Sequence, residues 1–319
     1  MSKLFCTIAI LLGCSSAFAQ HEKYKKVDET IEKIGALNNI NVAVIADTIT
    51  EPFNDNEQKA RAIFYWISHH IAIDPKATKQ NDTKNNLPEN VIALRRATPL
   101  GFSLLFQEMC STAKIRCLSV DGYVKHFATD INEVPDEINF SWNVVQLGQS
   151  PDTWFLVDAC SASGYLDKKL TLFTKQFTSE YFFADRKLFN QAYYPDNDAW
   201  QLGGGVKSLK EYYSMPVINS KAFELDMALN KNTPITGFIK TKIGVPVTFN
   251  FSINPNKKIE TIALIMGDDK KLPKPEAMNF ENTGGTVTFS YKFKKEETFP
   301  VKIMIDGREA LQYMVEVAE

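Results

Sequence analysis

The chain has 319 residues, of which 44% are hydrophobic and 23% are charged, and its formal net charge at pH 7 is −2. This length and composition are typical of a globular protein with about two domains. The sequence contains no basic block, so nucleic acid is not expected as a partner. No apolar stretch after residue 20 is long enough to span a bilayer.

The first residues have the pattern of an export signal. Lys3 provides a positive start, residues 4–12 are mostly apolar, and Ala17-Phe18-Ala19 has the small-x-small form that signal peptidases cleave. We therefore predict a signal peptide over residues 1–19 and a mature protein that is secreted or held in the periplasm of a bacterium. The alternative is a lipid anchor at Cys14, which follows two leucines and a glycine.

The predicted mature chain keeps Cys110, Cys117 and Cys160, which cannot all pair within one chain, and no Cys-x-x-Cys motif is present. A disulfide framework or a zinc knuckle is therefore not expected. His69 and His70 are neighbours in a predicted helix, where consecutive side chains point about 100° apart and do not easily share a metal ion. We predict neither a metal site nor a cofactor.

Helices and strands are both predicted in the first two thirds of the chain. Apolar residues recur at helical spacing over residues 57–71, and again after Thr98-Pro99, where the threonine can cap a helix and the proline suits its first turn. Residues 75–90 are rich in Lys, Asn, Asp and Thr and are predicted to form a surface loop. Alternation in a strand over residues 139–145 places Phe140 and Trp142 on one face. Further strands are predicted over residues 115–124 and 154–159.

These segments resemble a known family. The run Gly101-Phe102-Ser103-Leu104-Leu105-Phe106-Gln107-Glu108-Met109-Cys110, preceded by Arg95-Arg96 and a turn, is similar to the nucleophile helix of the transglutaminase-like superfamily, in its kyphoscoliosis-peptidase-like branch. The helix over 57–71, the strand that ends at Gly122-Tyr123, the motif Trp154-Phe155-Leu156-Val157-Asp158-Ala159 and the turn at 195–202 resemble the same family in the same order. The resemblance covers residues 57–216. It implies an α+β, papain-like or transglutaminase-like domain, in which helices pack on an antiparallel sheet.

The resemblance also assigns roles to three positions. The family's nucleophilic cysteine corresponds to Pro99, its general-base histidine to Phe140, and the acid that orients the histidine to Asp158. Proline and phenylalanine cannot form a thiolate or carry a proton. We therefore expect a degenerate triad and no catalytic activity, because removing one member of such a triad typically costs several orders of magnitude in rate.

Two alternatives remain open for this region. A relocated site with Cys160 as the nucleophile and His126 as the base would make the chain a thiol peptidase or an amidotransferase. The aromatic residues Trp142, Trp154 and Tyr165, together with Cys160, would instead line a cleft that binds a peptide or a sugar chain. Core packing is the competing interpretation for Trp142 and Trp154.

From about residue 231 the pattern changes to short alternating segments. Strands are predicted over residues 236–242, 247–253, 261–266, 286–293, 301–305 and 312–317, separated by turns that contain Gly, Asn, Asp or Pro. Such closely spaced strands favour an antiparallel, immunoglobulin-like β-sandwich. We therefore predict a signal peptide over 1–19, a transglutaminase-like domain over 20–220 and a β-sandwich over 231–319.

Together these features predict an exported, catalytically inactive transglutaminase-like protein that acts as a binding or scaffold module in the bacterial envelope. Its ligand would be a protein, a peptide or a glycan. A further hypothesis is structural: the β-sandwich caps the former cleft, and the whole protein serves as a spacer.

Overall fold

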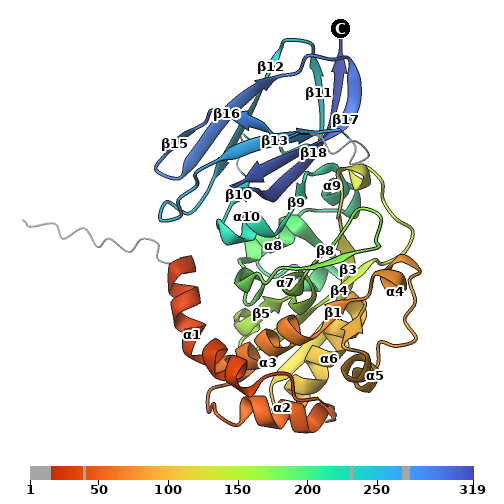
Figure 1. The fold of residues 1–319 in the computed structure, drawn as a ribbon, viewed down its shortest axis with the longest axis vertical. Coiled ribbons are helices and arrows are strands. Elements are labelled where there is room, and N and C mark those ends of the chain that lie inside the picture. Colours follow the sequence, from red (N-terminus) through yellow and green to blue (C-terminus); the bar gives the residue numbers. More distant parts are fainter. Residues whose placement is uncertain (1–15, 39–40, 230–232, 268–273) are drawn as a thin grey trace, which may run out of the picture.

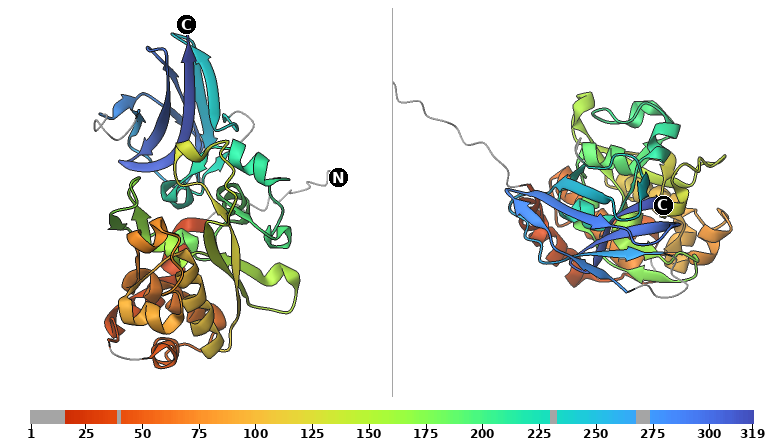
Figure 2. Two further views of the ribbon diagram at one scale, coloured as in Figure 1. Left: turned by 90° about the vertical axis from the view of Figure 1, so that its right-hand side faces the viewer. Right: turned by 90° about the horizontal axis from the view of Figure 1, so that it is seen from above.

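The computed structural model describes residues 16–38, 41–229, 233–267 and 274–319. Figure 1 shows helices and a small sheet in the lower part of the molecule, and a β structure built from the C-terminal strands in the upper part. The left view of Figure 2 shows the same two parts stacked end to end. The predicted combination of an α+β domain and a β-rich C-terminal part is confirmed.

Helices dominate the first part of the described chain. Asn41, Asp55 and Asp74 cap three of them, because their side-chain oxygens accept backbone N–H groups of the first turn. The α-helices are α1 (Ser16–Ile34), α2 (Val42–Thr50), α3 (Asn56–His70), α4 (Pro75–Lys79), α5 (Pro88–Leu94), α6 (Pro99–Thr112), α7 (Ala159–Ser163), α8 (Arg186–Ala192), α9 (Leu209–Ser214) and α10 (Ser220–Glu224). The short 3-10 helices are η1 (Ala128–Asp130), η2 (Pro151–Thr153), η3 (Ser179–Tyr181) and η4 (Asp198–Trp200).

The helix α4 corrects one sequence prediction, because it lies within the segment 75–90 that was expected to be a loop. Asp74 caps it and Pro75 occupies its first turn, where the missing N–H of proline is no loss. The helix predicted to start at Pro99 is confirmed as α6.

The strands of the first part form a main sheet and two small pairs. The main antiparallel sheet has the order β5-β4-β3-β8, and its strands are β5 (Trp154–Val157), β4 (Phe140–Gln146), β3 (Arg116–Val124) and β8 (Tyr193–Pro195). The small pairs are β1 (Ala72–Ile73) with β2 (Arg96–Ala97), and β6 (Gly164–Leu166) with β7 (Phe173–Lys175). Helix α6 packs on β3 and β4.

The C-terminal strands form two sheets, with the orders β10-β12-β16-β15 and β11-β18-β17-β13-β14. The strands are β9 (Val217–Ile218), β10 (Ala228–Leu229), β11 (Phe238–Lys242), β12 (Pro246–Ser252), β13 (Ile262–Met266), β14 (Glu276–Met278), β15 (Glu281–Thr283), β16 (Thr286–Lys292), β17 (Glu297–Ile305) and β18 (Arg308–Ala318). β11 runs parallel to β18, which differs from the all-antiparallel expectation. β9 and β10 also pair with strands of these sheets, although they precede residue 231.

Arg61 of α3 links α1 to the rest of the first part through an ion pair with Asp28. Its side chain is 1% exposed, and its Nε and Nη2 atoms donate to the two carboxylate oxygens of Asp28 at 2.8 and 2.7 Å. The guanidinium carbon also lies 4.9 Å from the ring centre of Tyr24 and 5.1 Å from that of Phe64. A buried charge is tolerated here because it is both paired and surrounded by aromatic rings.

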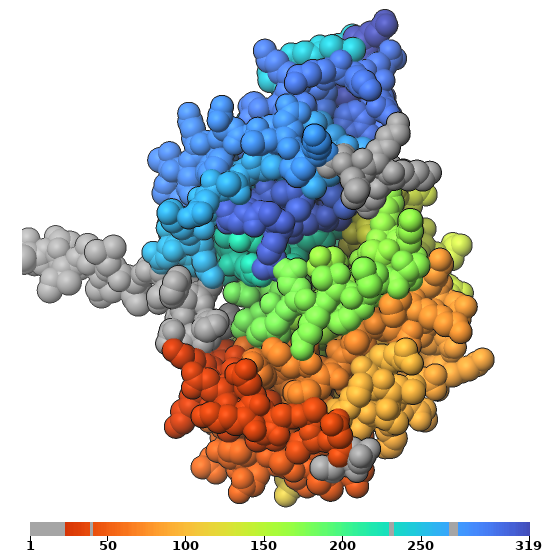
Figure 3. All heavy atoms as spheres, in the orientation of Figure 1, coloured from red at the N-terminus to blue at the C-terminus, as the bar shows by residue number. Residues whose placement is uncertain are grey.

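Buried apolar side chains from the two parts belong to one continuous core cluster. On the face of the molecule that Figure 3 shows, the C-terminal strands lie directly against residues from the middle of the sequence. The predicted signal peptide falls mostly outside the described residues, and α1 begins at Ser16. In the described part of the chain, no helix is both long enough and apolar enough to cross a membrane.

Candidate functional site

The candidate site begins at the start of α6, where protein atoms are closely packed. Pro99 is the first residue of the helix and is buried. Thr98 makes no side-chain cap bond, and its hydroxyl donates instead to the Asn86 Oδ1 atom at 2.9 Å. A side chain at Gly101 would not fit, because a Cβ there would lie 2.7 Å from both the Ala97 Cβ and the Asn86 Oδ1.

A buried polar cluster joins α6 to the main sheet. The Ser103 hydroxyl lies 2.5 Å from the Ser119 hydroxyl and 3.0 Å from the carbonyl oxygen of Trp142. The Asn143 amide donates to the Ser103 carbonyl at 3.0 Å. Side chains alternate along a strand, so Asn143 faces α6, while Trp142 and Phe140 face the other side of the sheet.

Asp158 lies at the end of β5 and caps α7. One carboxylate oxygen accepts the Ser161 backbone N–H at 2.9 Å, and the other accepts the Tyr193 hydroxyl at 2.6 Å. The carboxylate is 1% exposed. Burial raises the pKa of Asp158 above its usual value, and the hydrogen bonds from Ser161 and Tyr193 oppose that rise. The acid that was expected to orient a histidine is thus held by a tyrosine and by a helix N-terminus.

Tyr193 brings two of the three predicted positions together. Its ring centre lies 5.9 Å from that of Phe140 and 5.4 Å from that of Trp142, while its hydroxyl binds Asp158. The Asn143 side chain binds Ser103 in α6, the helix that Pro99 begins. The structure therefore joins Phe140 and Asp158 through Tyr193.

The four residues expected to line a cleft have different surroundings. Trp142 and Cys160 are each 1% exposed and Trp154 is 9% exposed, so these three belong to the core. Tyr165, in β6, is 52% exposed. A hollow of about 10 Å³, enough for one water molecule, lies beside Phe127 and β18, and none of the four lines it.

The relocated site would need a reactive thiol at Cys160 and His126 as its base. Burial raises the pKa of the Cys160 thiol well above its usual value, and the Asp158 carboxylate raises it further. The thiol is therefore protonated at neutral pH, which is the opposite of what a nucleophilic cysteine requires. The His126 ring centre lies 5.8 Å from that of Phe140, which in turn contacts Tyr193.

The two adjacent histidines of α3 pack on aromatic rings of their own helix. His69 stacks on Tyr65 with ring centres 3.9 Å apart, and His70 stacks on Trp66 at 4.9 Å. In each case Nδ1 lies 2.8 Å from the carbonyl oxygen of the same aromatic residue. Within the described ranges, no group of three metal-binding side chains occurs.

A buried lysine lies beside His126. Lys125 is 4% exposed, and its Nζ donates to the Tyr212 carbonyl and lies 3.5 Å from the centre of the Tyr212 ring. Burial lowers the pKa of Lys125 to about 7, and the Asp130 carboxylate opposes that effect. Nothing in the local sequence pattern shows that Lys125 is buried, so this residue could not be predicted from the sequence.

Tyr193 was also missed, although one signal pointed to its position. The segment 195–202 resembles a turn of the family, and Tyr193 precedes that segment by two residues. The contact with Asp158 joins positions 35 residues apart in the chain. Spacing in the sequence alone does not show that these two side chains meet.

Comparison with known proteins agrees with this architecture. Residues 43–159 match the family model of the transglutaminase-like superfamily. The chain is 28% identical over 251 residues to the kyphoscoliosis peptidase of Mus musculus, and 27% identical over 253 residues to that of Homo sapiens. Each match covers 76% of this chain and 37% of the relative. A solved structure described as a TGase aligns with 50% of this chain and 36% of its own at 12% identity, with a TM-score of 0.29.

The chain thus carries a transglutaminase-like domain, and its relatives support the kyphoscoliosis-peptidase-like branch of that superfamily. The chain spans only 37% of the length of these curated relatives, so their activity as whole proteins does not transfer directly.

Proposed function

We propose that this chain is a catalytically inactive transglutaminase-like protein that acts as a binding or scaffold module. One observation carries the proposal: the Asp158 carboxylate accepts a hydrogen bond from the phenol of Tyr193 at 2.6 Å. Burial and the nearby Asp158 carboxylate raise the pKa of Tyr193 well above its usual value. A phenol that stays protonated cannot take a proton from a thiol, so it does not replace the imidazole of a triad.

The chemistry of the other two positions supports the same conclusion. A Cys–His–Asp site needs a thiol that an adjacent imidazole can deprotonate and a carboxylate that orients the imidazole. In the resemblance to the family, Pro99 and Phe140 correspond to the first two positions, and their side chains offer neither group. The matched relatives are named as peptidases, so loss of activity would have occurred on a retained fold.

The test is a pair of turnover assays on residues 20–319. Fluorescently labelled casein reports peptidase activity, and incorporation of a dansylated amine into casein reports transamidation. We expect no product above the protein-free blank in either assay. Turnover that is abolished by Cys160→Ser or by Asp158→Asn would refute the proposal and favour the relocated thiol site.

We propose Tyr165 as the contact for a peptide or glycan ligand, because it is the predicted cleft residue with a largely exposed ring. Exposed aromatic rings bind both peptide and sugar surfaces. Casein-derived peptides and soluble peptidoglycan fragments can be titrated against the protein by calorimetry. Tyr165→Ala should weaken binding about tenfold or more, as for a residue at the centre of an interface. Ile235→Ala, which alters an exposed residue of the C-terminal part, is the matched control and should have no effect.

We also propose that residues 1–19 export the protein to the bacterial envelope. The positive start, apolar run and Ala-x-Ala site support this step. Mass spectrometry of the protein recovered from a producing bacterium should give a mature N-terminus at Gln20. A recovered protein that retains residues 1–19 in the cytoplasm would contradict it, and a diacylglyceryl group on Cys14 would favour the lipid anchor instead.

A further inference from the structure

The segment Val217–Leu229, called here the plug segment, is bonded to the C-terminal sheets at both of its ends. Its first strand, β9, pairs with β18. Its last strand, β10, pairs with β12. Between them, Asn219 donates its backbone N–H to the Ala310 carbonyl at 2.9 Å, and Asn254 donates to the Leu225 carbonyl at 2.9 Å. The short helix α10 is therefore carried by the β-sandwich.

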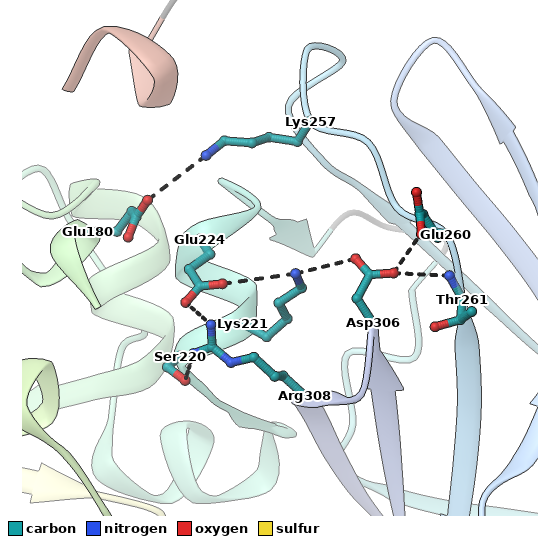
Figure 4. Close-up of polar contacts among 9 residues, drawn as sticks. All are labelled: Glu180, Ser220, Lys221, Glu224, Lys257, Glu260, Thr261, Asp306 and Arg308. Atoms are coloured by element: carbon teal, nitrogen blue, oxygen red, sulfur yellow. Dashed lines mark hydrogen bonds and ion pairs between the residues drawn. The ribbon is translucent and has the colours of Figure 1, made fainter. Parts of the chain in front are cut away.

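Ion pairs reinforce these backbone bonds on the polar side of α10, as Figure 4 shows. Arg308 of β18 pairs with Glu224, and Lys221 lies 3.4 Å from the Asp306 carboxylate. Asp306 is itself fixed, because it accepts the backbone N–H groups of Glu260 and Thr261 at 2.8 and 3.0 Å. The side chains of the two ion pairs are between 13% and 30% exposed. Pairs shielded to this extent are worth more than fully exposed ones.

The apolar side of α10 packs on the cluster that surrounds Asp158. Phe223 is 2% exposed, and its ring centre lies 4.6 Å from that of Tyr181 and 6.5 Å from those of Phe189 and Tyr193. Tyr193 is the residue that holds the Asp158 carboxylate. Phe223 thus covers the aromatic residues that enclose the candidate site.

A third ion pair connects the β-sandwich to the same aromatic cluster. Lys257 lies 3.9 Å from Glu180, in the 3-10 helix η3 that also carries Tyr181. The backbone of Tyr181 accepts the Asp158 N–H at 3.0 Å. Both elements that cover Asp158 from this side, η3 and α10, are therefore held by charges of the β-sandwich (Figure 4).

We infer that the plug segment covers the Asp158 cluster, which consists of Asp158, Tyr181, Phe189 and Tyr193. The β-sandwich acts as a latch, because its ion pairs hold the plug segment over this cluster. Access to Asp158 and Cys160 then requires α10 to leave both the sandwich and the aromatic cluster, which breaks the Arg308–Glu224 and Lys221–Asp306 pairs. Such a local opening costs less than complete unfolding, because only the contacts of one element are lost. The inference concerns access alone, so it holds whether the cluster binds a ligand or performs chemistry.

The test measures how fast two buried thiols of the same chain react with iodoacetamide. Cys160 follows Asp158 in α7, whereas Cys110 lies near the far end of α6, and both are buried. Mass spectrometry of peptides gives the two rates separately. In Arg308→Gln we expect Cys160 to react about tenfold faster, as for loss of one partly buried ion pair, while the Cys110 rate stays within about twofold of wild type. Lys258→Gln is the matched control, because its pair with Glu260 is exposed, and it should change neither rate.

Wild-type protein provides a second measurement that needs no variant. Raising sodium chloride from about 0.05 to 1 M screens partly buried pairs much less than exposed ones, so the Cys160 rate should rise less than in Arg308→Gln while the Cys110 rate stays unchanged. An Arg308→Gln protein in which both thiols react equally faster has lost global stability, and that result would overturn the latch. An unchanged Cys160 rate in both the variant and high salt would overturn it as well.

Discussion

Replacing Tyr193 by phenylalanine should destabilise the protein in a way that depends on pH. The substitution keeps the ring contacts with Phe140 and Trp142 and removes only the hydroxyl that donates to Asp158 at 2.6 Å. A hydrogen bond to a charged group contributes about 1.5–3 kcal/mol, and leaving a buried acceptor unpaired adds to the loss. Asp158 is 1% exposed, so water cannot replace the lost donor. We expect a loss of about 3 kcal/mol in the free energy of unfolding at pH 8.

The pH dependence follows from the raised pKa of Asp158 in the folded protein. Between the unfolded and folded pKa values the folded state binds more protons, so the contribution of Asp158 to stability falls as pH rises through this window. The lost hydroxyl stabilised the charged form, and Tyr193→Phe therefore raises the folded pKa further. The deficit of the variant should accordingly be small, about 1 kcal/mol, near pH 4 and largest above the folded pKa.

Urea unfolding at several pH values measures this deficit, with tryptophan fluorescence as the probe because Trp142 contacts Tyr193. Asp158→Asn and the double variant complete a mutant cycle that isolates the coupling between the two residues. A deficit that is the same at pH 4 and pH 8, or a coupling below about 0.5 kcal/mol, would show that the hydroxyl does not stabilise a buried carboxylate.

Three further predictions rest on other features. The folded pKa of Lys125 is about 7, below its ordinary value of 10.5. The unfolded state therefore binds more protons than the folded state above pH 7, and the free energy of unfolding should rise with pH from 7 towards 10. Lys125→Met should flatten that rise in urea titrations. Arg61→Ala leaves the Asp28 carboxylate without its bidentate partner and should cost about 3–5 kcal/mol by thermal unfolding, whereas Lys258→Ala at an exposed pair should cost less than about 1 kcal/mol. Gly164→Ala would place a Cβ 2.1 Å from the Thr174 carbonyl oxygen at a φ of +149° and should disrupt the β6–β7 hairpin, seen as faster proteolysis there. Gly204→Ala, at a φ of +85° with no atom within 4 Å, is the control for backbone strain without a clash and should leave proteolysis of the hairpin unchanged. Unchanged proteolysis in Gly164→Ala, a flat pH profile in wild type, or equal costs for Arg61→Ala and Lys258→Ala would contradict these expectations.

Much of the first domain could be predicted from local pattern. Helical periodicity and the Thr98-Pro99 start define α6, and alternation defines β4 around Trp142. The transglutaminase-like architecture was predictable because matched motifs occur in the same order along the chain. The short helix α4 was missed, since a polar segment reads as a loop unless the capping role of Asp74 is weighed.

The contents of the candidate site were less predictable. The resemblance singled out Pro99, Phe140 and Asp158. It did not single out Tyr193, whose ring contacts Phe140 and whose hydroxyl binds Asp158. Trp142, Trp154 and Cys160 could be named as aromatic or thiol side chains near the site, yet their burial depends on neighbours from distant segments. Burial is a property of packing, and pKa values such as that of Lys125 follow from it.

The sequence by itself predicted most of the helices and strands and the family resemblance, because each depends on residue identity and short-range spacing. The interpretation that Pro99 and Phe140 replace a thiol and an imidazole rests on the same resemblance. Only the tertiary structure decided that Tyr193 holds Asp158, that β11 lies parallel to β18, and that the segment Val217–Leu229 belongs to the β-sandwich while its Phe223 packs on the first domain. These features are contacts between residues far apart in the chain. Their free energy depends on how whole surfaces fit together, which local patterns do not encode.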